Sequence, residues 1–165
     1  MLEMSVRRLR SLGSFQGVSF FLLLSVALPL LSCAGTKPNN LGVKDARLAP
    51  CPSSPNCVSS DADDSSHFVP AFQLAAPVPE AWRAVRSVVA KLPRTSIVTA
   101  TDDYLYAECR SAFFGFVDDL ELHLRPEQNI IAVRSAARLG RSDFGVNRKR
   151  VETVRALLIK QGALR

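Results

Sequence analysis

The stretch between Thr95 and Leu139 constrains the fold most, because four consecutive segments in it have the residue pattern of β-strands. Apolar and polar side chains alternate along these segments, and β-branched or aromatic residues are frequent in them. Short polar connections separate the segments, so strands that follow one another along the chain are expected to pair as antiparallel hairpins. The predicted strands are residues 95–101, 104–110, 116–124 and 130–139.

The first predicted hairpin turns at Asp102 and Asp103, with Thr101 opposite Tyr104. Because side chains alternate between the two faces of a strand, this register fixes which residues share a face. One face should carry Val98, Ala100, Leu105, Ala107 and Cys109, with Cys109 as a buried core thiol. The other face should expose Ile97, Thr99, Tyr104, Tyr106 and Glu108.

The second predicted hairpin places Leu124 opposite Asn129. Its apolar side chains then share one face, while Asp119 lies opposite Arg134 and Glu121 lies diagonal to that arginine. This polar face predicts an ion-pair network, whose expected members are Asp118, Asp119, Glu121 and Arg134.

Helical patterns flank the four strands. Residues 77–92 begin with prolines suited to a first helical turn, and residues 144–161 carry an apolar stripe with charges elsewhere. Residues 68–74 read as a short edge strand. The predicted fold is therefore α+β: a single domain with an antiparallel sheet of about five strands packed on two helices, in the order β-α-β-β-β-β-α. This order resembles the helix-grip fold, which implies an apolar ligand between the sheet and the last helix.

The first 32 residues have the pattern of an export signal. Arg7, Arg8 and Arg10 precede an uncharged apolar run of 14 residues, 18–31, which is shorter than the roughly 20 residues that span a bilayer. Leu30-Leu31-Ser32-Cys33 resembles the bacterial lipobox. The resemblance implies cleavage before Cys33 and its acylation with fatty chains such as palmitate.

The lipoprotein reading places the chain in the cell envelope, anchored to membrane lipid through Cys33. Ala34 at the second mature position favours the outer membrane and a periplasm-facing domain. The alternatives are an ordinary cleaved signal, an uncleaved anchor, or twin-arginine export. Residues 33–49 lack a helix or strand period and are expected to be a flexible tether, with the domain at residues 50–165.

Three cysteines remain beyond the lipobox. Cys51 and Cys57 bracket a short turn that contains two prolines, and export would place them in an oxidising compartment, so we expect a disulfide between them. A metal site is the alternative, but no CxxC pair or histidine cluster accompanies them. No metal or other cofactor is expected.

A polar segment, residues 134–150, leaves the last strand and enters the last helix. Backbone N–H groups and arginines in it would suit a phosphate or carboxylate. The candidate anion-binding residues are Arg134, Arg138, Arg141, Asp143, Asn147 and Arg148. The alternative is that these arginines are neutralised by the carboxylates of the ion-pair network.

These motifs also carry a family resemblance. The segment from Cys51 to Cys57, Phe116-Val-Asp-Asp119 with Glu121, and residues 134–150 are similar to the family named domain of unknown function 1499. The similarity spans about residues 49–164. Ala137 and Arg141 depart from the pattern, which has Ser and an aromatic residue there. The resemblance implies a shared fold and assigns no activity.

Other motifs are weaker. Asp61, Asp63, Asp64 and His67 lack the spacing of a calcium loop and are expected to form a solvated acidic loop, and His123 is expected to be exposed on its strand. There is no P-loop, dinucleotide fingerprint or nucleophile elbow.

The charge balance is mildly basic. The formal charge is +6, and removal of three arginines and one glutamate with residues 1–32 leaves +4. This favours anionic lipid or an anionic small molecule as a partner and is too small to indicate nucleic acid.

Three functions follow. The first is a non-enzymatic module that binds a small amphipathic or anionic ligand. The second is a structural lipoprotein that docks on envelope proteins through an exposed Tyr104 and Tyr106 face. The third, least favoured, is an enzyme that uses Asp118, Asp119, Glu121 and the arginines.

Overall fold

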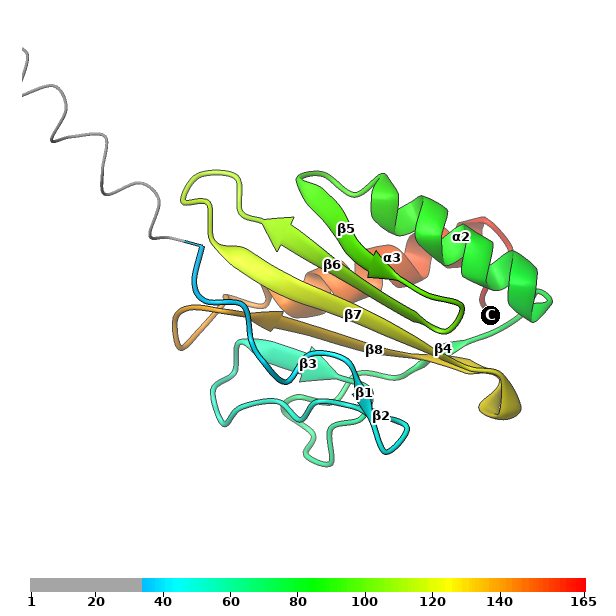
Figure 1. Cartoon of the computed structure of the whole chain (residues 1–165), viewed down its shortest axis with the longest axis horizontal. Helices are drawn as coiled ribbons and strands as arrows, with labels where there is room; N and C mark the ends of the chain where they lie inside the picture. The colour runs from blue at the N-terminus through cyan, green and yellow to red at the C-terminus, as the bar shows by residue number, and fades with distance from the viewer. Residues whose placement is uncertain (1–33) are drawn as a thin grey trace, which may run out of the picture. The chain divides into compact units, whose positions relative to one another are not determined.

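A computed structural model describes residues 34–165 (Figure 1). The predicted signal peptide and the lipidated Cys33 lie outside the described residues, so both stay predictions. The described residues belong to one compact unit.

An antiparallel sheet of six strands forms the centre of this unit. Strands follow one another in space as β3, β8, β7, β6 and β5, and β4 pairs with β8 as well. The bounds are β3 Cys57–Ser59, β4 Phe72–Gln73, β5 Thr95–Ala100, β6 Tyr104–Arg110, β7 Val117–Arg125 and β8 Ile130–Ala137. The predicted α+β fold with a sheet packed on two helices is confirmed, and both predicted hairpins form.

Two helices, α2 (Val78–Ala90) and α3 (Val146–Lys160), cover one face of the sheet (Figure 1). Pro79 lies in the first turn of α2, where its missing N–H costs nothing. The apolar stripe of α3 packs inward, and Val151, Val154 and Leu158 have no exposed surface. They belong to one continuous core with residues of α2 and the sheet. The space in which the helix-grip resemblance implied a ligand is therefore filled by side chains.

The first hairpin has the predicted register near its turn and a different one beyond it. Ala100 pairs with Leu105, as predicted, but a β-bulge between Ile97 and Thr99 shifts the pairing by one residue. Ile97 consequently pairs with Ala107 and packs against the core, while Val98 is 48% exposed. The predicted faces of these two residues are wrong, because a bulge exchanges the faces of all residues beyond it.

The second hairpin is offset from the prediction by two residues. A 3-10 turn, η2 (Pro126–Gln128), followed by Asn129 in the left-handed conformation, connects the strands, so Arg125 pairs with Ile130. Glu121, rather than Asp119, therefore lies opposite Arg134. The predicted faces survive, because an even offset keeps every side chain on its own face.

The outer face of the sheet, away from the helices, is covered by the chain around residues 37–48, which we call the strap. It contains a two-stranded ribbon, β1 (Val43–Lys44) and β2 (Arg47–Leu48), and Leu48 is buried (Figure 1). The prediction of an unstructured tether is wrong for these residues. The expected exposed tyrosine face is wrong as well, since Tyr106 is only 2% exposed.

The first sheet strand was missed by the sequence reading. β3 begins at Cys57, directly after the turn, and pairs with β8, with Cys57 opposite Ala136. The predicted Cys51–Cys57 disulfide is confirmed and closes that turn. Cys109 is free and buried, as predicted. The predicted strand at residues 68–74 is reduced to β4.

Candidate functional site

Beneath the strap lies a buried set of ion pairs built on Glu121. Tyr104 Oη donates to Glu121 Oε1 at 2.7 Å, and Arg134 Nη1 donates to Oε2 at 2.8 Å. The backbone N–H of Gly42, in the strap, donates to the same Oε1 at 2.8 Å. A buried carboxylate requires several such partners, and Glu121, with no exposed surface, has them. The strap is thus held to the sheet through Glu121.

A parallel arrangement surrounds Asp119. Tyr106 Oη donates to Asp119 Oδ1 at 2.8 Å, and Arg138 Nε donates to the same carboxylate at 3.0 Å. Arg138 also reaches Glu108 at 2.6 Å, and Lys37 of the strap lies 4.7 Å above the Tyr106 ring. Each tyrosine therefore serves as a hydrogen-bond donor to a carboxylate that an arginine neutralises.

Burial and hydrogen bonding shift the pKa values of four groups in this network. It raises the pKa of Tyr104 and of Tyr106, and the adjacent carboxylates raise both further, so the phenols stay protonated. The hydrogen bond from Arg138 lowers the pKa of Glu108. Burial lowers the pKa of Arg138, but its bonds to Asp119 and Glu108 outweigh that and raise it. These four shifts favour protonated phenols at Tyr104 and Tyr106, an ionised Glu108 and a charged Arg138.

A second polar cluster lies on the helix side, where α3 begins. Asn147 is fully buried, and its Nδ2 donates to the carbonyl of Asn56 at 3.1 Å. Ser135 Oγ donates to Asn147 Oδ1 at 2.6 Å, and Arg150 Nη1 donates to Ser135 Oγ at 2.9 Å. Arg150 also forms an ion pair with Asp118 at 2.6 Å. This cluster attaches the first turn of α3 to β7, β8 and the turn before β3.

The six candidate anion-binding residues do not gather at one place. Arg134 and Arg138 lie in the outer-face network, and Asn147 lies in the buried cluster. Arg148 donates to the backbone carbonyls of Phe68 and Ser66 at 2.9 Å each. Asp143 accepts from the N–H of Asn147 at 2.7 Å at the start of α3, and Arg141 is exposed.

The candidate ion-pair residues do form ion pairs, with partners that differ from the expected ones. Glu121 pairs with Arg134, Asp119 with Arg138, and Asp118 with Arg150. Asp118 is separated from the other two by the sheet, because neighbouring residues of β7 point to opposite faces.

Another basic site, which the sequence reading missed, is a cleft of about 470 Å³ between the loop that follows α2 and the first turns of α3. We call it the basic cleft. Its cationic lining residues are Arg94, Arg110, Lys149 and Arg150, and its one carboxylate is Asp118. Three of these cations are exposed, and Arg150 is half-buried. They come from three separate segments, so no local motif announces the site.

The inner wall of the basic cleft carries Asp118 and Cys109. Burial raises the pKa of both groups, and the nearby Arg150 opposes the shift. Thr95 Oγ1 lies 3.5 Å from Cys109 Sγ. With Asp118 held by Arg150 and the thiol favoured over the thiolate, this wall offers neither a free general base nor an activated nucleophile.

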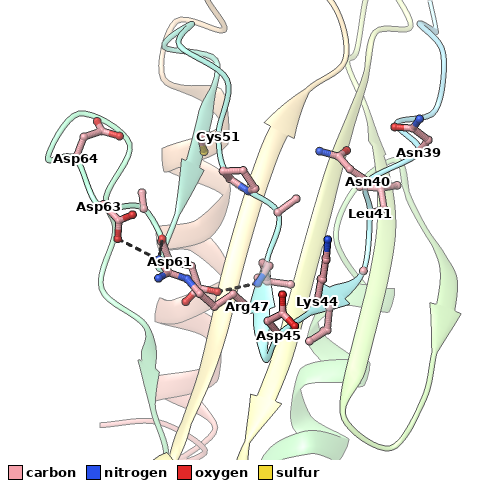
Figure 2. Close-up of a pocket in the computed structure, with 16 residues that line it drawn as sticks. Asn39, Asn40, Leu41, Lys44, Asp45, Arg47, Cys51, Asp61, Asp63 and Asp64 are labelled. Carbon is pink, nitrogen blue, oxygen red and sulfur yellow. Dashed lines mark hydrogen bonds and ion pairs between the residues drawn. The ribbon is translucent and has the colours of Figure 1, made fainter.

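A larger open hollow, about 840 Å³, lies between the β1–β2 ribbon and the loop after β3 (Figure 2). Two of its four aspartates are bound to arginines: Asp61 pairs with Arg125 at 2.5 Å, and Asp63 pairs with Arg47 at 3.1 Å. Burial raises the pKa of Asp61, but Arg125 and the N–H of Leu48 outweigh it, so the pKa is lowered. The prediction of a solvated acidic loop is wrong for Asp61.

Both histidines are buried, contrary to the expected exposure of His123. His67 Nδ1 lies 2.8 Å from Asp64 Oδ2, and its Nε2 lies 3.1 Å from the carbonyl of Ser54. His123 lies 3.2 Å from Arg125 Nε. Within residues 34–165, no three His, Cys, Asp or Glu side chains are grouped as metal ligands. In the same range, every helix is too short or too polar to cross a bilayer.

Comparison with known proteins gives one assignment. No curated protein matches the chain. A family model described as "Protein of unknown function (DUF1499)" matches residues 47–158, which is more than half of the chain and includes β2 through most of α3. The chain therefore belongs to the DUF1499 family of proteins of unknown function.

Proposed function

We propose that this protein is a membrane-anchored envelope lipoprotein whose domain binds an anionic, phosphate-bearing ligand without catalysing a reaction. The observation that carries the proposal is the basic cleft, in which four cationic side chains surround one carboxylate. Its volume of about 470 Å³ is within the range of small-molecule sites.

The charge in the cleft is only partly compensated. Arg150 is neutralised by Asp118, and Arg110 reaches Glu108 at 3.3 Å. Among residues 34–165, Arg94 and Lys149 form no ion pair, and Arg94 Nε donates only to the carbonyl of Arg110. Arg94 and Lys149 thus remain to bind an incoming phosphate, beside the Arg150 guanidinium that Asp118 holds.

The geometry disfavours the other readings of ligand binding and catalysis. The core between α3 and the sheet is filled, so an internal apolar ligand has no space there. The carboxylates expected to act in an enzyme each lie within 2.8 Å of an arginine nitrogen.

A structural or interaction role is the second candidate, and the rigid filled core supports it. The tyrosine face is no longer a docking surface, because the strap covers it. A partner protein would have to bind elsewhere, such as on the loops at residues 111–116 and 138–145.

Titration calorimetry with inorganic phosphate and glycerol 1-phosphate tests the proposed site. The full chain, purified from membranes in detergent, should bind both, and Lys149→Ala should weaken binding about tenfold, as expected for one charge-assisted contact. Lys160→Ala is the matched control, because Lys160 is an exposed lysine eleven residues further along the same helix. Absent binding, or equal losses in both variants, would refute the basic cleft as the site.

The anchor is tested separately through Cys33→Ser. The variant should escape cleavage before residue 33 and should no longer incorporate labelled palmitate. If it still incorporates the label, acylation is elsewhere and the anchor assignment is wrong.

A further inference from the structure

Large apolar side chains are exposed at one end of the domain. Phe113 is 93% exposed and Phe144 is 96% exposed, and four further apolar side chains near them in the chain are each exposed by at least two fifths. A globular surface rarely exposes phenylalanine to this degree without a partner. The further residues are Phe114, Phe116, Leu139 and Val146.

Five of these residues lie in two loops that leave the same end of the sheet, and Val146 begins α3. One loop, residues 111–116, connects β6 to β7, and the other, residues 138–145, connects β8 to α3. Asp118 at the start of β7 pairs with Ala137 at the end of β8, and the N–H of Arg138 donates to the carbonyl of Val117 at 3.2 Å. Both loops therefore project from the same end of the sheet (Figure 1). We call it the loop end.

Positive charge surrounds the apolar side chains. Arg141 is exposed within the second loop, Arg110 is exposed next to the first, and Lys149 is exposed one turn into α3. The nearby Asp143 is engaged with backbone N–H groups of the α3 first turn. The basic cleft opens at this end as well, since Ser111 and Val146 also line it.

The opposite end of the sheet exposes a different set of charged residues. It is formed by the turn between β5 and β6 and the turn between β7 and β8, which the 2.7 Å hydrogen bond from Leu124 N to the carbonyl of Asp103 joins. Its exposed charged residues include the acids Asp102, Asp103 and Glu127. Arg83 and Arg86 line a hollow with Asp102, so this end has mixed charge. The loop end combines exposed phenylalanine side chains with exposed cations, so an anionic surface would attract it more strongly.

The described chain begins at the loop end. Gly35 packs against Arg138 and Leu139 so closely that a Cβ added to it would lie 2.8 Å from Arg138 Cβ and 2.9 Å from Leu139 Cγ. Cys33 is two peptide bonds before Gly35, at most about 7.6 Å between Cα atoms. An acyl chain on Cys33 would enter a bilayer beside the loop end.

We propose that the loop end is a membrane-contacting surface that docks on an anionic phospholipid leaflet. Phe113, Phe114 and Phe144 would enter the interface between headgroups and acyl chains, where aromatic side chains are favoured. Arg141, Arg110 and Lys149 would lie at the level of the phosphates. The inference rests on the anchored part of the proposed function for its orientation, and it names the membrane surface as the partner.

Single-tryptophan variants of the full chain test this surface. Trp82 is the one native tryptophan, and its Nε1 donates to the carbonyl of Thr101, so it reports on the opposite end. The reporters are Phe113→Trp and Phe144→Trp, each combined with Trp82→Phe. In vesicles of mixed zwitterionic and anionic phospholipid, both reporters should show blue-shifted emission and lose intensity when brominated acyl chains are present. Trp82 in the parent should show neither change.

Changes in the charge of the protein and of the vesicles separate the possible partners. Arg141→Glu should lower the docked fraction by more than about fivefold, because it removes one positive charge, which alone is worth about fivefold near an anionic surface, and adds a negative one. Replacing the anionic vesicles by purely zwitterionic ones should lower the docked fraction of the unsubstituted reporters to a similar degree. Reporters that keep water-exposed emission in anionic vesicles would overturn the membrane proposal and favour a protein partner for these loops.

The outcome is distinguishable from a failure of the proposed function. If Phe113→Trp and Phe144→Trp dock while Lys149→Ala leaves phosphate binding unchanged, the membrane surface stands and the basic cleft fails. If free phosphate binds and the reporters stay in water, the cleft stands and the membrane surface fails. Far-UV circular dichroism of each variant checks folding, and Trp82→Phe alone serves as the reference, because Trp82 is a buried core residue.

Discussion

Glu121 and Arg134 face each other across β7 and β8 and form a buried ion pair of 2.8 Å. Their side chains are 0% and 5% exposed. A buried pair is weak evidence of net stabilisation, because desolvation of both charges offsets most of their attraction. Removal of one partner is different, since it leaves the other charge buried and uncompensated.

Arg134→Met should therefore lower the free energy of unfolding by roughly 3–5 kcal/mol. The double variant Glu121→Gln with Arg134→Met should recover part of that loss, because the amide keeps acceptors for Tyr104 and the strap N–H without an uncompensated charge. Urea denaturation followed by circular dichroism measures both. A double variant as unstable as the sum of its single variants would show that the pair is not coupled.

The two histidines should titrate on opposite sides of their ordinary pKa of 6.5. The hydrogen bond to Asp64 raises the pKa of His67, whereas burial and the neighbouring Arg125 lower the pKa of His123. Imidazole resonances in a pH series of NMR spectra separate the two, and Asp64→Asn should return His67 towards its ordinary value. Similar midpoints for both histidines would contradict this assignment.

The interaction between His67 and Asp64 should stabilise the fold within a limited pH range. The raised pKa of His67 contributes stability below pH 6.5 that is lost as pH rises through the shifted value. The pKa of Asp64 is lowered by its bonds to Ser66 and His67, and this contributes stability above pH 3.8 that is lost as pH falls. The thermal midpoint of the parent relative to Asp64→Asn should thus be highest between these values. The difference in thermal midpoint will be small, because Asp64 is exposed.

Loss of the Cys51–Cys57 disulfide should cost about 2 kcal/mol by the chain-entropy model for so short a loop. The double variant Cys51→Ser with Cys57→Ser should also exchange amide hydrogens faster at β3, since Cys57 begins that strand opposite Ala136. Hydrogen exchange read by mass spectrometry measures this. Protection at β5, at the other edge of the sheet, should be unchanged and serves as the internal control.

The sequence predicted what depends on local patterns. Alternation over residues 95–139 identified four strands and the faces of most of their residues, and the turn with two prolines identified the disulfide. It did not predict pairing that depends on turn geometry, because the left-handed Asn129 and the 3-10 turn before it move the second hairpin by two residues. A bulge at Val98 had no signal either.

The candidate sites fared less well, for a physical reason. The sequence grouped arginines by proximity along the chain, but Arg134 and Arg138 lie in the outer-face network, whereas Arg148 on α3 donates to the carbonyl of Phe68. The basic cleft combines Arg94, Arg110 and Lys149, which are far apart in the chain. The strap was missed because polar residues with Gly and Pro favour loops, whereas its attachment depends on Glu121, about 80 residues away.

The bulge in β5 is tested by a pair of aspartate substitutions. Val98→Asp should change the free energy of unfolding by less than about 1 kcal/mol, because its side chain is half-exposed. Ile97→Asp should cost several-fold more, since Ile97 packs against the core and a carboxylate there would be desolvated. Urea denaturation of both variants decides the register. If Val98→Asp is the more destabilising variant, the strand pairs without a bulge and the bulged register is wrong.

The attachment of α3 depends on Asn147, whose amide has no exposed surface and joins Asn56, Ser135 and Arg150. In Asn147→Ala the buried Ser135 hydroxyl loses its acceptor, and the carbonyl of Asn56 and the Arg150 guanidinium each lose one of their partners. Because an unsatisfied buried group costs about 1–3 kcal/mol, the loss in unfolding free energy should be roughly 2–4 kcal/mol. Thr153→Ala, an exposed position on the same helix, should change it by less than about 0.5 kcal/mol.

Hydrogen exchange should locate the damage at the first turns of α3. Amides near Lys149 and Arg150 should exchange faster in Asn147→Ala, while those near Leu158, which the apolar core holds, should keep their protection relative to the global stability. Uniform acceleration along α3 would mean that the core alone positions the helix. Local acceleration would show that the buried amide fixes the wall of the basic cleft, since Lys149 and Arg150 line that cleft.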